Sequence, residues 1–295
     1  MRCTNPVTIN ASKRSGDNYY NRPEYIEVRC KKCLACRITI RKEWSLRLLT
    51  ELHYYKDNSL FCTLTYDDEH CPLSLSKREI QLFNKRLRRA VHPLKYKFFM
   101  CGEYGTKTFR PHYHFLFFGI NMSHIDVIMS IWNKCDWNNP HIRSKSFDNV
   151  AMHNIEYVAG YIHSKLSGME EDYQYLQQDI EPPFRLSSKY LGKQYIDDNA
   201  DKLREDKHIK RNGYEVPLPE YYRKKLSLTA EDYRDIIYDV DIKQNEKLLG
   251  ISNDSESFST DIELIVKLES EKKSRNAQLD KNLKSKSSLK QRGDL

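Results

Sequence analysis

Two histidines one residue apart, His112 and His114, have the clearest chemical potential in this sequence. They lie in an apolar, aromatic-rich run over residues 111–119, which predicts a buried β-strand. Side chains two residues apart on a strand point to the same side of the sheet, so both imidazoles are expected to project together. Two adjacent imidazoles on a rigid strand can bind a divalent metal ion, and the alternative is two histidines that share a strand by chance.

Glu103 is the candidate third ligand of this metal site. It ends another predicted strand, over residues 96–103, nine residues before His112. If the two strands pair as a hairpin with a long tip, the carboxylate lies beside the histidines. Two imidazoles and a carboxylate with open coordination positions suit Mg²⁺ or Mn²⁺, with phosphate oxygens and water completing the shell. The alternative for Glu103 is an exposed loop glutamate.

Two tyrosines and a lysine recur at intervals of four residues further along the chain. Tyr157, Tyr161 and Lys165 fall in a helix predicted over residues 155–167, which Asn154 can cap, and this spacing puts them on one helical face. Such a stripe is more often structural than catalytic. Beside a metal-bound phosphate, however, a tyrosine hydroxyl can attack a phosphodiester, and a lysine can hold a phosphate or help stabilise the phenolate. Two tyrosines one turn apart allow two successive transesterifications without hydrolysis.

Four cysteines near the N-terminus are candidates for a structural metal site. Cys30, Cys33 and Cys36 form a Cys-x2-Cys-x2-Cys sequence, with Cys3 upstream. In a chain that opens without an apolar leader, this spacing is more typical of metal ligands than of disulfides. Structural zinc needs four ligands, and Cys3 is the candidate for the fourth. A ferredoxin-type cluster is disfavoured because position 40 is Ile and no Cys-Pro follows. Reduced cysteines without metal are the alternative.

Strands and helices that alternate along the chain must position these residues. After a largely irregular N-terminal segment, apolar periodicity and capping signals predict a helix over 38–56, a strand over 59–66, a helix from the Ser76–Glu79 capping box to Pro93, the two strands above, a helix over 123–134, a weak strand over 141–147 and the tyrosine helix. This order predicts an α+β fold with a mostly antiparallel central sheet flanked by helices.

Taken together, the motifs resemble those of the HUH endonucleases. Thr63-Leu64-Thr65-Tyr66, the His-x-His strand and the Tyr-x3-Tyr helix follow one another in that superfamily's order. The segment from Cys30 to Arg37 is similar to the cysteine motif of the replication initiators of microviruses, small single-stranded-DNA bacteriophages, of the gokushovirus type. The resemblance covers roughly residues 1–170. It implies an HUH-like sheet and a rolling-circle initiator that nicks the plus strand of duplex phage DNA at an origin, stays linked to the 5′ end through phosphotyrosine, and rejoins unit-length circles.

The resemblance also implies individual residue roles and partners. The metal ligands would be His112 and His114 with Glu103, the nucleophiles Tyr157 and Tyr161, and the helper cation Lys165. The partners implied are viral origin DNA, both single-stranded and duplex, and the replicative helicase and polymerase of a bacterial host, in whose cytoplasm the protein would act.

Composition and charge agree with a DNA-binding protein. The formal net charge is +8, and aromatic residues make up 12% of the chain; basic side chains neutralise phosphates and rings stack on bases. Candidate DNA contacts are Arg41, Arg86, Arg88 and Arg89, and the alternative for each is a solvated helix face. The sequence contains neither a run of eighteen apolar residues, which disfavours membrane insertion, nor a P-loop, which excludes a P-loop helicase.

The sequence predicts four segments. Residues 1–37 form a cysteine-rich segment stapled by zinc, residues 38–168 the nuclease core, residues 169–240 a helical extension, and residues 241–295 a polar, partly disordered tail. Two other functions stay open: a plasmid or mobile-element HUH nuclease, and a non-catalytic, zinc-stapled DNA-binding protein whose tyrosines serve as core or stacking residues.

Overall fold

The structure, a computed structural model, describes residues 3–10, 25–105, 107–164, 175, 177–211, 213–229, 231–233 and 262–293. The chain divides into two compact units. The larger comprises residues 40–226, and the smaller comprises residues 1–39 with 227–295. The boundary falls within the long helix α1 (Leu34–Tyr54), which begins in the smaller unit and continues into the larger one. No helix among the described residues is both long enough and apolar enough to cross a membrane.

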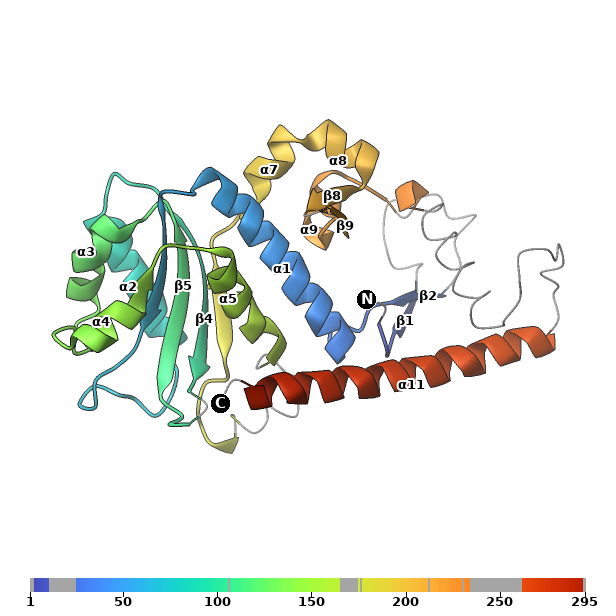
Figure 1. The fold of residues 1–295 in the computed structure, drawn as a ribbon, viewed down its shortest axis with the longest axis horizontal. Coiled ribbons are helices and arrows are strands. Elements are labelled where there is room, and N and C mark those ends of the chain that lie inside the picture. Colours follow the sequence, from blue (N-terminus) through green and yellow to red (C-terminus); the bar gives the residue numbers. More distant parts are fainter. Residues whose placement is uncertain are drawn as a thin grey trace. The chain divides into compact units, whose positions relative to one another are not determined.

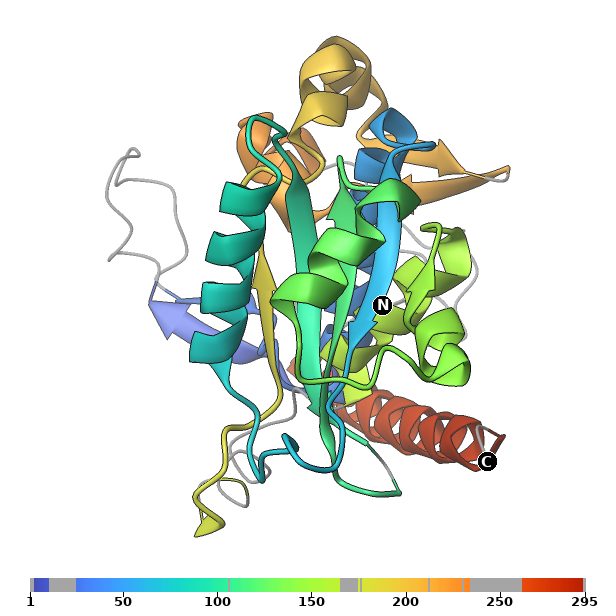
Figure 2. The same ribbon diagram turned by 90° about the vertical axis from the view of Figure 1, so that its left-hand side faces the viewer.

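The larger unit is built on an antiparallel sheet. Among the described residues this sheet has five strands in the spatial order β6-β3-β5-β4-β7, and Figure 2 shows them side by side with β7, in yellow, next to β4. Their bounds are β3 (Ser59–Leu64), β4 (Lys97–Tyr104), β5 (Pro111–Phe118), β6 (Phe147–Asp148) and β7 (Phe184–Ser187). Every neighbouring pair is antiparallel. The predicted α+β class and antiparallel sheet are therefore confirmed.

Helices cover both faces of this sheet (Figure 1). On one face, α2 (Lys77–Ala90) and α3 (Ile125–Ile131) pack on strand residues such as Phe115 and Phe117. On the other, α5 (Met152–Ser164) and the part of α1 in this unit pack on Leu116 and Phe118. Because successive strand residues alternate between faces, β5 supplies both cores. A third helix, α4 (Pro140–Ser146), follows η3 (Met122–His124) and α3 and lies beside β3 and β6.

Two predicted elements differ from the structure near the sheet. The weak strand expected over residues 141–147 is wrong, because Pro140 occupies the first turn of α4 and Asn139 caps it by accepting the His141 backbone N–H at 3.0 Å. Helix α5 begins at Met152, before the expected start, and Asn154 lies inside its first turn, where Oδ1 accepts the Ala151 N–H at 2.7 Å. The last residues of that predicted helix, 165–167, lie outside the described residues.

After β7 the larger unit continues with short elements. These are α7 (Lys193–Asp198), α8 (Ala200–Asp206), the hairpin of β8 (His208–Arg211) and β9 (Tyr214–Pro217), and α9 (Glu220–Lys225). The sequence predicted only helical stretches here, so β7, β8 and β9 are additional strands. Tyr222 of α9 is fully buried, and its hydroxyl is hydrogen-bonded to that of Thr50 on α1.

The smaller unit has two strands where an irregular segment was expected. β1 (Val7–Asn10) pairs antiparallel with β2 (Tyr25–Val28), and α1 starts soon afterwards. The turn η4 (Glu231–Tyr233) and the long helix α11 (Ile262–Gly293) complete its described part. Much of the predicted polar tail is thus helical, and residues 241–261 of that prediction lie outside the described residues.

Candidate metal and tyrosine site

Three predicted metal ligands meet on the β4–β5 hairpin. In its register Glu103 is the direct partner of His112, and His114 is the next β5 residue on the same face. Glu103 Oε1 lies 2.9 Å from His112 Nε2 and 3.0 Å from His114 Nε2. The structure therefore brings the predicted trio together, with one carboxylate oxygen in contact with both imidazoles. Their role as ligands stays a prediction.

Hydrogen bonds on the far sides of the rings orient the imidazoles. His112 Nδ1 lies 3.0 Å from the Arg110 carbonyl oxygen, which can only accept, so this nitrogen carries a proton. His114 Nδ1 lies 3.0 Å from Thr63 Oγ1 on β3. In neutral His112 the Nε2 lone pair would then face the lone pairs of Glu103, an arrangement that calls for a cation between them. A second imidazole proton or a metal ion satisfies this need, and the donor set fits a divalent metal.

Burial strengthens this need for positive charge. Glu103 is 2% exposed and His114 is 4% exposed, while His112 is half-buried. A carboxylate removed from water is costly unless it is paired or coordinates a metal. The trio is thus closed to solvent at His114 and more open at His112.

The two predicted tyrosines lie directly against this trio. The ring centroids of Tyr157 and Tyr161 are 5.0 Å apart, and they lie 5.1 and 5.3 Å from the His114 ring. Tyr161 stacks on His114 with an interplanar angle of 8°, whereas Tyr157 meets it edge to face and is 48% exposed. Spacing of one helical turn on α5 therefore brings both phenols to one imidazole.

Packing of α5 on the sheet fixes the position of these tyrosines. Ile155, Val158 and Ala159 are fully buried in the core on that face, spaced three and four residues apart. Burial raises the pKa of the Tyr161 hydroxyl above its ordinary value, and the negative charge of Glu103 and hydrogen bonding with Tyr157 raise it further. A cation at Glu103 would oppose this shift, because positive charge favours the phenolate.

The predicted basic residues divide between the two faces of the sheet. Arg41 of α1 lies against α5, where its guanidinium donates to the Glu156 carbonyl at 3.3 Å and faces Gly160. The other three, Arg86, Arg88 and Arg89, are on α2, which covers the opposite face. Lys165 lies outside the described residues. Of the predicted cations that the structure describes, Arg41 is the one beside the tyrosines.

Thr63 and Phe61 are site neighbours to which the sequence gave no specific role. Thr63 is paired with His114 in the β3–β5 register, and Phe61 stacks on the His114 ring at a centroid distance of 6.1 Å. Thr63 belongs to a motif that was noted, but its contact follows only from the register of β3 against β5. The four predicted cysteines also come together, in the smaller unit, where their sulfur atoms all lie within 4.8 Å of one another.

Comparison with known proteins points to phage replication. The family model for replication-associated proteins of the ORF2 type matches residues 59–166, which include the trio and both tyrosines. Replication-associated protein VP4 of Bdellovibrio phage phiMH2K is 31% identical over 217 residues, which cover 66% of this chain and 65% of that protein. Replication-associated protein ORF2 of Spiroplasma virus 4 is 28% identical over 271 residues, covering 79% and 82% of the respective chains.

A third relative is replication-associated protein ORF4 of Chlamydia phage 1, with 28% identity over 220 residues that cover 69% of this chain and 54% of that protein. The chain therefore spans just under two thirds of the Bdellovibrio phage protein and about half of the Chlamydia phage protein. No solved structure matches the chain, so the HUH-like character of the sheet stays a prediction. The family match and these relatives agree with the resemblance that the motifs predicted, and the chain belongs to the microvirus-type replication-associated proteins of phages.

Proposed function

We propose that this protein initiates rolling-circle replication by nicking the plus strand of duplex phage DNA at an origin through a tyrosine nucleophile. The observation that carries the proposal is the meeting of Glu103, His112 and His114 with both tyrosines of α5. The names of the relatives support the replication setting. The protein would then act on viral origin DNA in the cytoplasm of a bacterial host, alongside the host's replicative helicase and polymerase.

Glu103, His112 and His114 would hold Mg²⁺ or Mn²⁺. A carboxylate oxygen and two imidazole nitrogens leave coordination positions for phosphate and water. When bound, such an ion offsets the negative charge that develops on the phosphate oxygens. The hydrogen bonds to Arg110 and Thr63 keep the two Nε2 atoms directed at the carboxylate.

The tyrosines would perform the strand transfer. Tyrosine Oη forms a bond to phosphorus while the bond from phosphorus to the 3′ oxygen breaks, and the phenolic proton ends on the released 3′ hydroxyl. The product is a 5′-phosphotyrosine and a free 3′ end that a polymerase can extend. After one round, the second tyrosine repeats this attack at the regenerated origin, and the 3′ hydroxyl so released attacks the first phosphotyrosine to close the circle.

Tyr161 is our choice for the first attack. In a continuous helix Lys165 lies one turn beyond it on the same face and would offset phenolate charge. Arg41, which contacts α5 beside both tyrosines, would hold a neighbouring phosphate. The exposure of Tyr157 suits a residue that meets the DNA later, when the first tyrosine is esterified.

Two other functions compete with this proposal. A plasmid or mobile-element nuclease would use the same site, but the three relatives are proteins of phages and viruses, which favours the phage setting. A non-catalytic DNA-binding protein would use the tyrosines only for packing or stacking. The closeness of both rings to a buried trio of metal-ligand types favours catalysis.

A covalent-adduct assay tests the proposal. Single-stranded fragments that tile the phage plus strand, labelled at their 3′ ends, are incubated with the protein and Mn²⁺, and the protein is then denatured. We expect label on the protein for the fragment that contains the origin, because the 5′ phosphate of the labelled piece becomes attached. Mass spectrometry should find the nucleotide on Tyr157 or Tyr161.

The matched variants sharpen this assay. Tyr157→Phe/Tyr161→Phe should form no adduct yet still bind the fragment, because phenylalanine keeps the ring and loses only the nucleophile. Tyr190→Phe, an exposed tyrosine outside the site, is the control and should react like the unmodified protein. An adduct that persists in the double variant, or a label on another residue, would overturn the assignment of the nucleophiles.

A further inference from the structure

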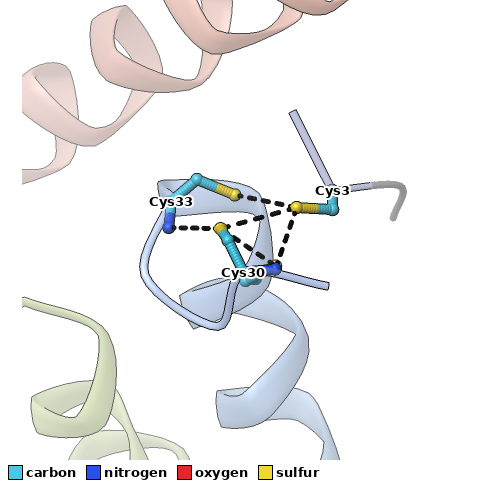
Figure 3. Close-up of side chains that lie close together, drawn as sticks. Cys3, Cys30 and Cys33 are labelled. Carbon is cyan, nitrogen blue, oxygen red and sulfur yellow. Dashed lines mark hydrogen bonds between the residues drawn. The ribbon is translucent and has the colours of Figure 1, made fainter. Parts of the chain in front are cut away.

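The cysteine cluster of the smaller unit has the geometry of a metal site. Cys3 precedes β1, Cys30 follows β2, Cys33 precedes α1, and Cys36 lies in its first turn. The Sγ atom of Cys3 is 3.5 Å from that of Cys30 and 3.8 Å from that of Cys33, and the Sγ atoms of Cys30 and Cys36 are 4.0 Å apart. Figure 3 shows Cys3, Cys30 and Cys33 pointing toward one another from three separate segments.

These distances match a tetrahedron of sulfur atoms around one ion. Zinc–sulfur bonds of about 2.3 Å at tetrahedral angles put neighbouring sulfur atoms about 3.8 Å apart. The three distances above, from 3.5 to 4.0 Å, lie on both sides of that value. A disulfide would need about 2.05 Å, and all four cysteines are free.

The backbone around the cluster is arranged to accept thiolate charge. The Cys30 N–H donates to Cys3 Sγ at 3.4 Å, and the Cys33 N–H donates to Cys30 Sγ at 3.2 Å. Such N–H groups fix the orientation of sulfur ligands and offset part of their negative charge. Cys3 and Cys36 are buried, while Cys30 and Cys33 are partly exposed, so the site is closed on one side and accessible for loading on the other.

We infer that Cys3, Cys30, Cys33 and Cys36 bind a structural zinc ion as four thiolates. The described core of this unit is small, with only Leu34, Ala35 and Leu283 as its buried members. The β1–β2 ribbon adds a four-residue pairing, and an isolated two-stranded ribbon is marginally stable. Tetrathiolate zinc would join both ends of the ribbon to the start of α1, as metals do in small units that lack a sufficient core.

This inference is independent of the proposed nuclease function, and its test keeps the two metal sites separate. The full chain carrying His112→Ala/His114→Ala is purified without chelator and supplied with zinc, so that only the cysteine cluster competes for the ion. Elemental analysis should find one zinc per chain. X-ray absorption should show a first shell of four sulfur atoms at about 2.3 Å.

Variants identify the ligands. In the same background Cys3→Ser should lower zinc retention during dialysis at least about tenfold, because the fourth thiolate is lost, and Cys36→Ser should do likewise. Cys71→Ser, a partly exposed cysteine outside the cluster, should retain zinc fully. If a variant does not fold, thiol titration of the parent protein decides: four thiols should become reactive when a chelator removes the zinc.

Three results would overturn the inference. One is the absence of zinc from the zinc-supplied protein, with all four thiols reactive throughout. Another is iron with the visible absorption of an iron–sulfur cluster. The third is full zinc retention by both Cys3→Ser and Cys36→Ser.

Discussion

The single carboxylate oxygen of Glu103 that contacts both histidines makes the trio interdependent. Removing one imidazole leaves Glu103 with one fewer partner and any metal with one fewer ligand. We therefore predict that His112→Ala and His114→Ala each lower nicking at least about a hundredfold while the fold persists, since changes to residues that merely support metal ligands already cost about 10- to 100-fold. Adduct yield in Mg²⁺ measures the first effect and circular dichroism the second. Normal cleavage by both variants would contradict a metal site here.

Thr63 positions His114 through the hydrogen bond between Oγ1 and Nδ1. We predict that Thr63→Val, which keeps the shape and removes the hydroxyl, lowers the affinity for Mn²⁺ about 10- to 100-fold. Adduct formation titrated against Mn²⁺ should show a shifted midpoint, with activity recovered at high metal concentration. Thr63→Ser restores a hydroxyl and should restore the midpoint. A lower plateau with an unchanged midpoint in Thr63→Val would instead indicate a purely structural role.

At this scale the sequence predicted which residues meet but not how they are oriented. The alternation of a strand was enough to place His112 and His114 on one face, because side chains repeat every two residues. The pairing of Glu103 with His112 depended on a hairpin register that spacing alone allowed. The contact of Thr63 with His114 required the register of β3, a strand about fifty residues away, which local patterns do not encode.

Helix α2 shows how an element can be stabilised without touching the site. Ser76 Oγ accepts the Glu79 backbone N–H at 3.2 Å, as the capping box predicted. We predict that Ser76→Ala lowers the free energy of unfolding by about 1 kcal/mol, the usual cost of losing a helix cap. Chemical denaturation measures this loss. Nicking at a temperature where the variant is folded should be unchanged, because α2 covers the opposite face of the sheet from the tyrosines.

Elements with strong local signals were predicted, and those with weak ones were not. The core helices and the three long strands were identified because each carries its own periodicity or cap. The strand predicted over 141–147 was wrong because the Asn139–Pro140 start signal, present in the sequence, outweighs a faint alternation. β7 has only four residues and no fully buried side chain, and its place in the sheet depends on β4, far earlier in the chain.

The whole molecule carries a formal charge of +8, and its candidate DNA contacts are on two faces of the sheet. We predict that Arg41→Gln lowers adduct yield about tenfold more than it lowers DNA affinity, because this guanidinium lies beside the tyrosines. Arg86→Gln/Arg89→Gln should weaken binding and reduce its salt dependence without a further effect on cleavage of bound DNA. Binding titrations at several salt concentrations, with single-turnover cleavage, separate these effects. Equal losses in binding and cleavage for Arg41→Gln would contradict its assignment.

The pairing of β7 with β4 bears on what the smallest stable nuclease could be. The stretch that matches the family model ends at residue 166, whereas β7 spans Phe184–Ser187. A protein shortened to that stretch would keep the histidines and tyrosines but expose the hydrogen-bonding edge of β4, where Phe99 to Gly102 pair with β7. Bare edges of this kind recruit strands from other molecules and promote aggregation. The chemistry of the site would thus be encoded in a shorter segment than the one that keeps it soluble.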